Sequence, residues 1–149
     1  MGIDRLVTAL SGFSKAKSSC LVIDGGTALK FCYVSNEGSF EGGGIFPGLE
    51  IAVKCLADNT AKIPLIKIGK KPFLIGKNTK EAVQSAIYWG YVDLINGMIS
   101  RYKRLDPSLK VFGTGNGLNI LKNEIHLNEF DKGLLMKGLK VVGDFILKI

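Results

Sequence analysis

Two short segments carry residue types that could act on a charged substrate, and the first is DGGT. Asp24 and Thr27 lie in it, directly after the apolar run CLVI, which predicts a tight turn at the end of a buried strand. Glycines let a backbone approach an anion closely, and free N–H groups together with the Thr27 hydroxyl can hold phosphate oxygens. Asp24 could hold a cation beside them. An Asp-Gly pair is also common in ordinary hairpin turns, so this segment alone leaves both interpretations open.

The second segment is GIDR, residues 2–5, which places an acid and a guanidinium at the start of a helix expected over 3–13. Asp4 could take a proton from a substrate hydroxyl as a general base. Arg5 could bind a carboxylate through two parallel hydrogen bonds. Taken alone, these two residues are explained more simply as a surface ion pair at a helix start.

Two glycine-rich segments could approach a ligand. GGGIFPG, residues 42–48, predicts a flexible loop before a helix opened by Pro47 and Gly48, whose free N-terminus could bind an anion. FGTGNG, residues 112–117, predicts a strand that runs through glycines into a helix and leaves room for a flat ring such as adenine. Ordinary turn chemistry explains each of these segments equally well.

The elements that must position these segments follow from the spacing of apolar residues. Strands are predicted over 20–24, 25–34, 39–46 and 109–115, with a brief extended segment over 63–68. Helices are predicted over 3–13, after Pro47, after a capping pair formed by Asn78 and Glu81, over 117–123, and over 133–149. Gly90 and Gly97 share a stripe of the long helix, which indicates a close helix–helix contact within the chain or across a dimer. A meander followed by alternating helices and strands predicts an α/β fold with a mixed sheet covered by helices.

Composition narrows the class of protein. The net charge of +7 is spread along the chain rather than clustered, which favours a solvated lysine-rich surface over a nucleic-acid binder. Three cysteines in apolar surroundings predict reduced thiols and a cytoplasmic protein. The most apolar long stretch, 83–98, is too short and too polar to span a bilayer. A mean hydropathy of +0.22 hints that a partner covers apolar surface.

The order of six segments resembles one known family. GIDR, DGGTA, GGGIFPGLE, TAKIP, IGKNTKEA and VFGTGNG follow one another as in the second half of type III pantothenate kinases, over residues 2–142. The resemblance implies a lobe of the actin-like ATPase (ribonuclease H-like) fold, with residues 1–149 forming a single lobe. It also implies ATP-dependent phosphorylation of pantothenate to 4'-phosphopantothenate, the first step of coenzyme A biosynthesis.

The resemblance assigns the substrate side of the site. Gly2, Ile3 and Arg5 match the family's substrate-contacting motif, in which Arg5 would hold the pantothenate end of the site. Asp4 would be the general base that takes the hydroxyl proton. Thr79 matches a second substrate contact, which in this family reaches the site across a dimer interface, so a homodimer is expected.

The resemblance also assigns the nucleotide side. Asp24 matches a position that binds a monovalent cation, usually potassium or ammonium, and Thr27 matches a contact with an ATP phosphate. Magnesium would accompany ATP, because neutralising the phosphates is central to phosphoryl transfer. Two features depart from the family pattern: Cys32 stands where an acid is common, and GTGNG replaces a plain TGG in the adenine-side loop.

The first lobe of the family, with its DxGNT phosphate loop, has no counterpart in this sequence. A truncated chain, a split enzyme whose first lobe is supplied by a separate chain, and a degenerate relative are all compatible with this. The expected assembly is therefore a homodimer or a heteromer with a first-lobe chain. The alternative function is a non-catalytic regulatory or binding subunit that retains the fold.

Overall fold

Five strands form one mixed sheet in the computed structural model, which describes residues 2–148. The strands are β1 (Cys20–Gly25), β2 (Ala28–Val34), β3 (Phe40–Pro47), β4 (Lys110–Thr114) and β5 (Glu129–Phe130), and their order in the sheet is β3-β2-β1-β4-β5. Neighbours among β1, β2 and β3 are antiparallel, whereas β4 is parallel to both β1 and β5. The predicted three-stranded meander and the α/β class are confirmed.

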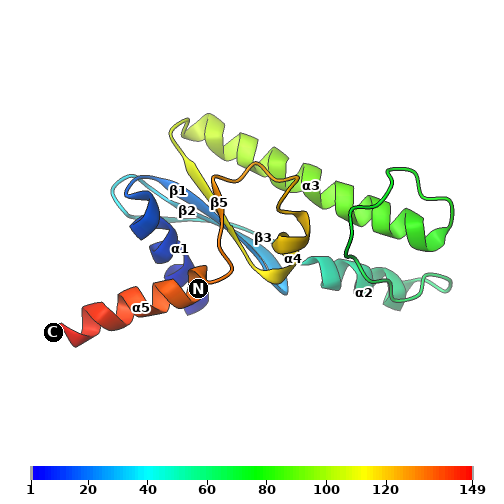
Figure 1. Cartoon of the computed structure of the whole chain (residues 1–149), viewed down its shortest axis with the longest axis horizontal. Coiled ribbons are helices and arrows are strands. Elements are labelled where there is room, and N and C mark those ends of the chain that lie inside the picture. Colours follow the sequence, from blue (N-terminus) through cyan, green and yellow to red (C-terminus); the bar gives the residue numbers. More distant parts are fainter. Residues whose placement is uncertain (1, 149) are drawn as a thin grey trace.

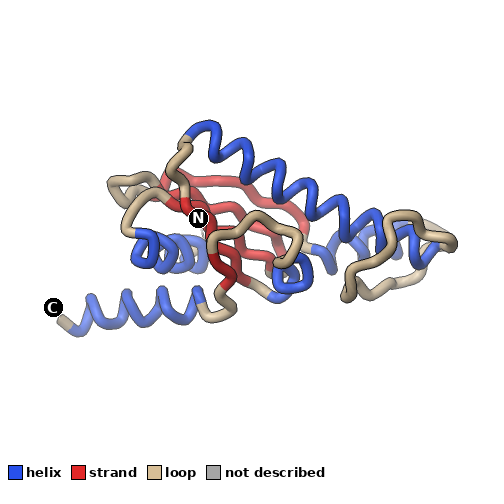
Figure 2. The backbone as a smooth tube through the Cα atoms, turned by 45° about the horizontal axis from the view of Figure 1, so that its top comes forward, coloured by secondary structure: helices blue, strands red, loops and turns tan. Residues whose placement is uncertain are grey.

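The helices cover both faces of the sheet. They are α1 (Ile3–Ala16), α2 (Leu49–Asn59), α3 (Thr79–Leu105), α4 (Asn116–Leu121) and α5 (Leu134–Leu147). Figure 2 shows the strands between α3 on one side and the pair formed by α1 and α5 on the other. The larger core joins one face of the sheet to α2, α3 and α4, and the smaller one joins the opposite face to α1 and the start of α5. No helix among residues 2–148 is long and apolar enough to cross a membrane.

Helix α1 is held closely between the sheet and α5. A Cβ added to Gly12 would lie 2.3 Å from Cγ2 of Val22 on β1, and one added to Gly138 would lie 2.3 Å from the carbonyl oxygen of Val7. Both glycines therefore permit backbone approaches that a side chain would prevent. Because Asp4 lies in the first turn of α1, this packing also fixes the start of the GIDR segment relative to the sheet.

Helix α3 begins where the capping pair predicts. Oδ1 of Asn78 accepts a hydrogen bond of 3.0 Å from the N–H of Glu81, and the Glu81 carboxylate accepts one of 2.9 Å from the N–H of Lys77. The early turns of α3, together with α2 and residues 60–78, extend to one end of the molecule (Figure 1). Gly90 and Gly97 have open space around them within the chain, so the expected close contact is not made inside this lobe.

The strand expected over 39–46 is confirmed, but the flexible loop expected over 42–48 is wrong. The glycines 42–44 lie within β3, paired with β2, instead of forming a flexible loop. A Cβ on Gly43 would lie 1.8 Å from the Phe31 carbonyl oxygen, so strand pairing itself accounts for glycine there. The extended segment 63–68 joins no sheet, although Ile66 and Ile68 are buried in the core. The two-residue strand β5 carried no sequence signal.

Candidate functional site

Two carboxylates from distant parts of the sequence meet at one ammonium group. Nζ of Lys30 lies 2.5 Å from Oδ2 of Asp4 and 3.2 Å from Oδ2 of Asp24. The Lys30 and Asp24 side chains are mostly buried, with 19% and 23% exposed, whereas that of Asp4 is 50% exposed. The structure therefore brings the expected base and the expected cation ligand together, and the Lys30 ammonium lies between them.

Local structure explains this meeting. Asp24 and Lys30 are direct partners in the antiparallel pair of β1 and β2, so their side chains emerge side by side on the face that α1 covers. Gly2 precedes α1, and a Cβ there would lie 2.4 Å from Oδ1 of Asp4. Glycine at this position thus leaves room for the Asp4 carboxylate. The neighbouring Ile3 is 76% exposed.

Asp4 and Lys30 stabilise each other's charged form. The hydrogen bond with Lys30 lowers the pKa of Asp4 below its usual value. Burial acts to lower the pKa of Lys30, but the hydrogen bond with Asp4 and the charge of Asp24 outweigh it and raise that pKa. At neutral pH Asp4 is therefore a carboxylate and Lys30 an ammonium.

Three glycine-containing turns converge beside Asp24. Gly115, which joins β4 to α4 with φ of 93°, is so close that a Cβ would lie 2.8 Å from Oδ1 of Asp24. A Cβ on Gly48 would lie 2.4 Å from the Gly26 carbonyl oxygen, at the start of α2. Gly26 and Thr27 themselves are exposed in the turn between β1 and β2. These turns lie at the carboxyl ends of the parallel strands β1 and β4, where open α/β sheets bind ligands.

Arg5 lies on the sheet side of α1. Its guanidinium carbon is 5.6 Å from the ring centroid of Phe40. Its Nε is buried and has no hydrogen-bond partner among residues 2–148. Burial raises the pKa of the nearby Cys32 thiol, and the hydrogen bond from Arg5 opposes that rise. Arg5 thus faces the position where the family pattern has an acid and this chain has a buried thiol.

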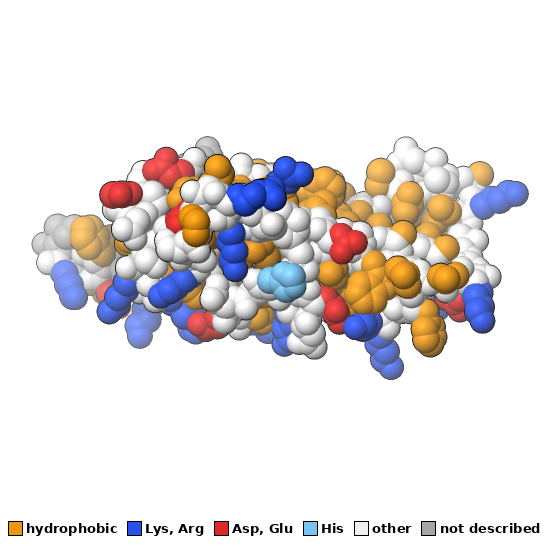
Figure 3. All heavy atoms as spheres, turned by 90° about the horizontal axis from the view of Figure 1, so that it is seen from above, with side chains coloured by type: hydrophobic (Ala, Val, Ile, Leu, Met, Phe, Trp, Pro, Cys, Tyr) orange, Lys and Arg blue, Asp and Glu red, His pale blue; other side chains and the backbone are white. Residues whose placement is uncertain are grey.

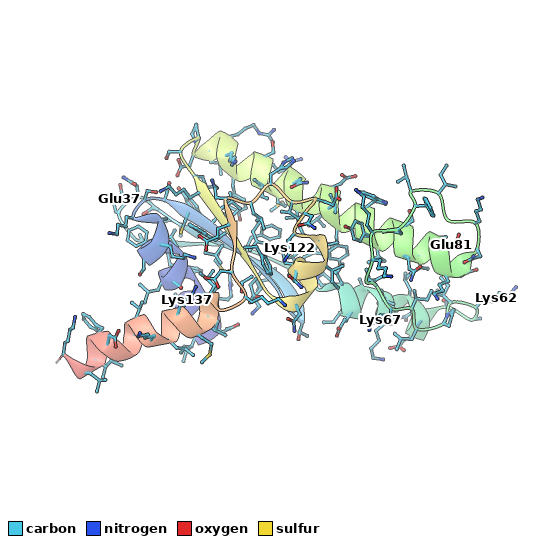
Figure 4. All side chains as sticks on the ribbon, in the orientation of Figure 1. Glu37, Lys62, Lys67, Glu81, Lys122 and Lys137 are labelled. Atoms are coloured by element: carbon cyan, nitrogen blue, oxygen red, sulfur yellow. The ribbon has the colours of Figure 1, made fainter. Side chains whose placement is uncertain are left out.

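Thr79 lies far from the other predicted site residues. It is the exposed first residue of α3, at the end of the molecule formed by α2 and residues 60–78. In Figure 4, Glu81 marks this end, whereas Lys137 of α5 lies toward the opposite one. Within a single chain, the structure does not bring Thr79 to Asp4.

Sequence reasoning missed Lys30. The signal was present, because a tight turn after Asp24 places the residue two positions beyond Ala28 opposite it in the hairpin. A lysine in that position, on the face that carries an aspartate, predicts an ion pair across the strands.

The comparisons with known proteins decide the family. The family model for type III pantothenate kinases matches residues 1–101, more than half of the chain. The chain belongs to this family. A type III pantothenate kinase from Citrifermentans bemidjiense is 36% identical over 146 residues, which cover 95% of this chain and 57% of the relative. A type III pantothenate kinase from Persephonella marina is 38% identical over 141 residues, which cover 93% of this chain and 55% of that relative. The chain thus spans slightly more than half the length of these family members.

A solved structure supports the fold. The crystal structure of a conserved Baf family protein from Campylobacter jejuni aligns with a TM-score of 0.73 at 21% identity. The alignment covers 100% of this chain and 66% of that one. The arrangement of helices and sheet described here therefore also occurs in a longer, distantly similar protein.

Proposed function

We propose that this chain is the catalytic half of an ATP-dependent kinase that phosphorylates pantothenate to 4'-phosphopantothenate, the first step of coenzyme A biosynthesis. The observation that carries the proposal is the meeting of Asp4 and Asp24 at Lys30, beside the turns at the ends of β1 and β4. A kinase needs a group that faces the substrate hydroxyl and a place that holds phosphate next to it. In this cluster, Asp4 would face the substrate hydroxyl, and the turns next to Asp24 would hold the phosphate.

In this proposal, Asp4 is the general base toward the pantothenate hydroxyl. Its lowered pKa keeps it ionised at neutral pH and makes it a weak base. Phosphoryl transfer depends more on positioning and charge than on base strength, so a hydroxyl oriented by this carboxylate suffices. Gly2 and Ile3 would line the substrate side with it.

Arg5 would hold the carboxylate of pantothenate. Its buried Nε has no partner among residues 2–148, and a guanidinium binds a carboxylate well through two parallel hydrogen bonds. The Phe40 ring under the guanidinium would limit the directions in which Arg5 can move.

The nucleotide would lie against the exposed turn at Gly26 and Thr27. The hydroxyl of the exposed Thr27 is suited to phosphate oxygens. The N–H of Gly26 donates to the Ala28 carbonyl oxygen and so holds the turn in shape. We expect magnesium to reach the site on ATP, with the phosphates among its ligands. The family resemblance also implies a positive charge at Asp24, supplied in the family by a monovalent cation next to these phosphates.

The proposal also includes the fold family of the chain and the cell compartment in which it works. A meander of three antiparallel strands followed by two parallel ones supports the assignment of residues 1–149 to a single lobe of the actin-like ATPase fold. The proposed compartment is the cytoplasm, whose reducing conditions suit a chain with three cysteines in apolar sequence surroundings.

A second lobe would pack against α1 and α5. These helices expose apolar side chains to solvent: Ile3, Leu6, Leu10, Leu135, Met136, Leu139, Phe145 and Ile146. Exposed apolar surface of this extent marks an interaction site. The relatives are nearly twice as long as this chain, and this face adjoins Asp4. We therefore propose that the first lobe, on the same or a separate chain, covers it.

A dimer would use the opposite end of the molecule. Figure 3 shows hydrophobic side chains gathered where residues 60–78 meet the start of α3. Leu65, Phe73, Leu74 and Ile75 are 71–90% exposed there. Leu65 and Phe73 also line a hollow of about 690 Å³. The family resemblance implies that Thr79 reaches a partner's site. We propose that two copies lie side by side in opposite directions, so that the Thr79 end of one lies against the Asp4 end of the other.

Reconstitution tests the function. The chain is mixed with the first lobe of the Citrifermentans bemidjiense relative, and transfer of labelled phosphate from ATP to pantothenate is measured. We expect transfer by the mixture and by neither part alone. If the mixture forms a complex that transfers no phosphate, and calorimetry detects neither pantothenate nor ATP binding, the chain is a non-catalytic subunit instead.

A further inference from the structure

One lysine joins the two carboxylates on which the proposed site depends. Nζ of Lys30 lies 2.5 Å from Asp4 and 3.2 Å from Asp24. We propose that the Lys30 ammonium is the built-in cation of this site and stands where a potassium or ammonium ion would otherwise bind Asp24. This inference rests on the proposed function and deepens it.

The chemistry of the groups favours the lysine over a separate ion. A lysine ammonium presents three N–H donors and one positive charge, much as an ammonium ion does. The carboxylates of Asp4 and Asp24 already accept two of its contacts. A second cation bound to the same Asp24 oxygen would meet the lysine charge at contact distance, where like charges repel strongly in a partly buried site. The residues around Asp24 therefore do not fit an additional monovalent cation.

The backbone holds the ammonium in place. Lys30 lies in β2, between β1 and β3, with Asp24 and Ile45 as its direct partners on either side. Its side chain is only 19% exposed. Because the charge is covalently attached, it is present at any salt concentration, whereas a bound ion dissociates as its concentration falls.

The position of Lys30 gives it a function in the proposed reaction. A phosphate that approaches the turn at Gly26 and Thr27 would otherwise meet two negative carboxylates. Lys30 neutralises part of that charge and does so without reorganisation when the substrate arrives. We therefore assign Lys30 as a positioning residue that balances charge between the base and the phosphates.

Thermal unfolding of the chain in different salts tests this assignment without any activity. Ligands that bind the folded state raise the melting temperature. We expect the wild-type chain to melt at the same temperature in potassium, ammonium and sodium chloride at equal ionic strength. The variant Lys30→Gln leaves two unpaired carboxylates, and we expect potassium or ammonium to raise its melting temperature relative to sodium. Lys54→Gln is the matched control, since it removes an exposed lysine paired with Asp58 and should respond to no particular cation.

Two results would overturn the proposal. One is a potassium-specific rise in the melting temperature of the wild-type chain, or binding of thallium(I), a potassium substitute, to it by thallium NMR. The other is a Lys30→Gln variant that folds but responds to no monovalent cation. The wild-type measurements decide the question even if Lys30→Gln fails to fold.

Kinetics of the reconstituted enzyme separate this inference from the proposed function. We expect the wild-type rate to be equal in potassium and sodium, and the Lys30→Gln rate to be at least about tenfold lower in sodium and partly restored by ammonium. An active enzyme that requires potassium would contradict the role of Lys30 while leaving the kinase assignment intact. An inactive mixture would count against the kinase assignment, and the melting data would still test Lys30.

Discussion

Lys30 and Asp24 are cross-strand partners, and the Lys30 ammonium lies 3.2 Å from the Asp24 carboxylate. Both residues belong to central strands of the sheet, so their relative position is set by backbone pairing. Asp4 reaches the same ammonium from the first turn of α1 and is half exposed. Strand pairing thus fixes the side proposed for the nucleotide, whereas the side proposed for the hydroxyl is open to solvent.

The first prediction concerns Asp4 as the base. In the reconstituted enzyme, we expect Asp4→Asn to lower kcat by about 10²–10⁴-fold, the range typical of general-base catalysis. Because the Asp4 side chain is 50% exposed, its ion pair with Lys30 contributes little to stability, and the melting temperature should change little. Steady-state kinetics and thermal unfolding of the same preparation check both expectations.

The matched control for Asp4 is Asp58→Asn, which removes a carboxylate from an exposed ion pair with Lys54 on α2. It should leave kcat unchanged. If Asp4→Asn lowers kcat less than about tenfold, Asp4 is not the base, although it could still orient the substrate.

The second prediction concerns the packing of α1 against α5. Gly138→Ala places a methyl group 2.3 Å from the Val7 carbonyl oxygen, so the helices must separate. Overpacking of this kind costs about 1–3 kcal/mol. Urea unfolding should show the loss of stability. Gly143→Ala, on the same helix with open space around it, should instead stabilise the chain by up to about 1 kcal/mol through helix propensity. Equal effects of the two substitutions would mean that α5 does not pack on α1 as described.

The third prediction concerns acid stability. Asp131 joins α5 to α1 through Lys137, at 2.5 Å, and Lys15, at 3.1 Å. The hydrogen bond with Lys137, supported by Lys15 and the N–H of Gly133, lowers the pKa of Asp131 from 3.8 to about 2. Because the folded pKa is below the unfolded one, the contribution is complete above pH 4 and is lost as the pH falls toward 2.

Urea unfolding at several pH values measures that contribution. At neutral pH we expect Asp131→Asn to reduce the free energy of unfolding by about 1 kcal/mol, a value discounted because Lys137 is largely solvent-exposed. The difference from wild type should shrink between pH 4 and pH 2. A difference that stays constant over this range would show that the charge of Asp131 is not what stabilises the contact.

Sequence periodicity predicted most of the fold because its signals are local. The strand before Asp24, the cap at Asn78 and the strand–glycine–helix order around Gly115 each depend on neighbouring residues. The sequence placed glycines 42–44 in both a strand and a loop, because glycine is common in turns and also where another backbone lies very close, as Phe31 does to Gly43. The position of Lys30 beside Asp24 depends on the register of two strands, and the role proposed for Thr79 depends on a second chain. The first could have been found by pairing the two strands across the turn, whereas the second is beyond any single chain.

The last prediction concerns self-association at the start of α3. Phe73 and Ile75 are 90% and 79% exposed, so they contribute little to the folding of one chain. If two copies pair there, Phe73→Asp places a charge in an apolar interface, which is costly because the carboxylate loses its hydration. We expect analytical ultracentrifugation to show a dimer for the wild-type chain and a monomer for Phe73→Asp. Leu105→Asp is the control: Leu105 is 82% exposed at the far end of α3, and its substitution should leave the dimer intact. If Leu105→Asp dissociates the dimer and Phe73→Asp does not, the interface lies elsewhere, and Thr79 cannot reach a partner's site by this route.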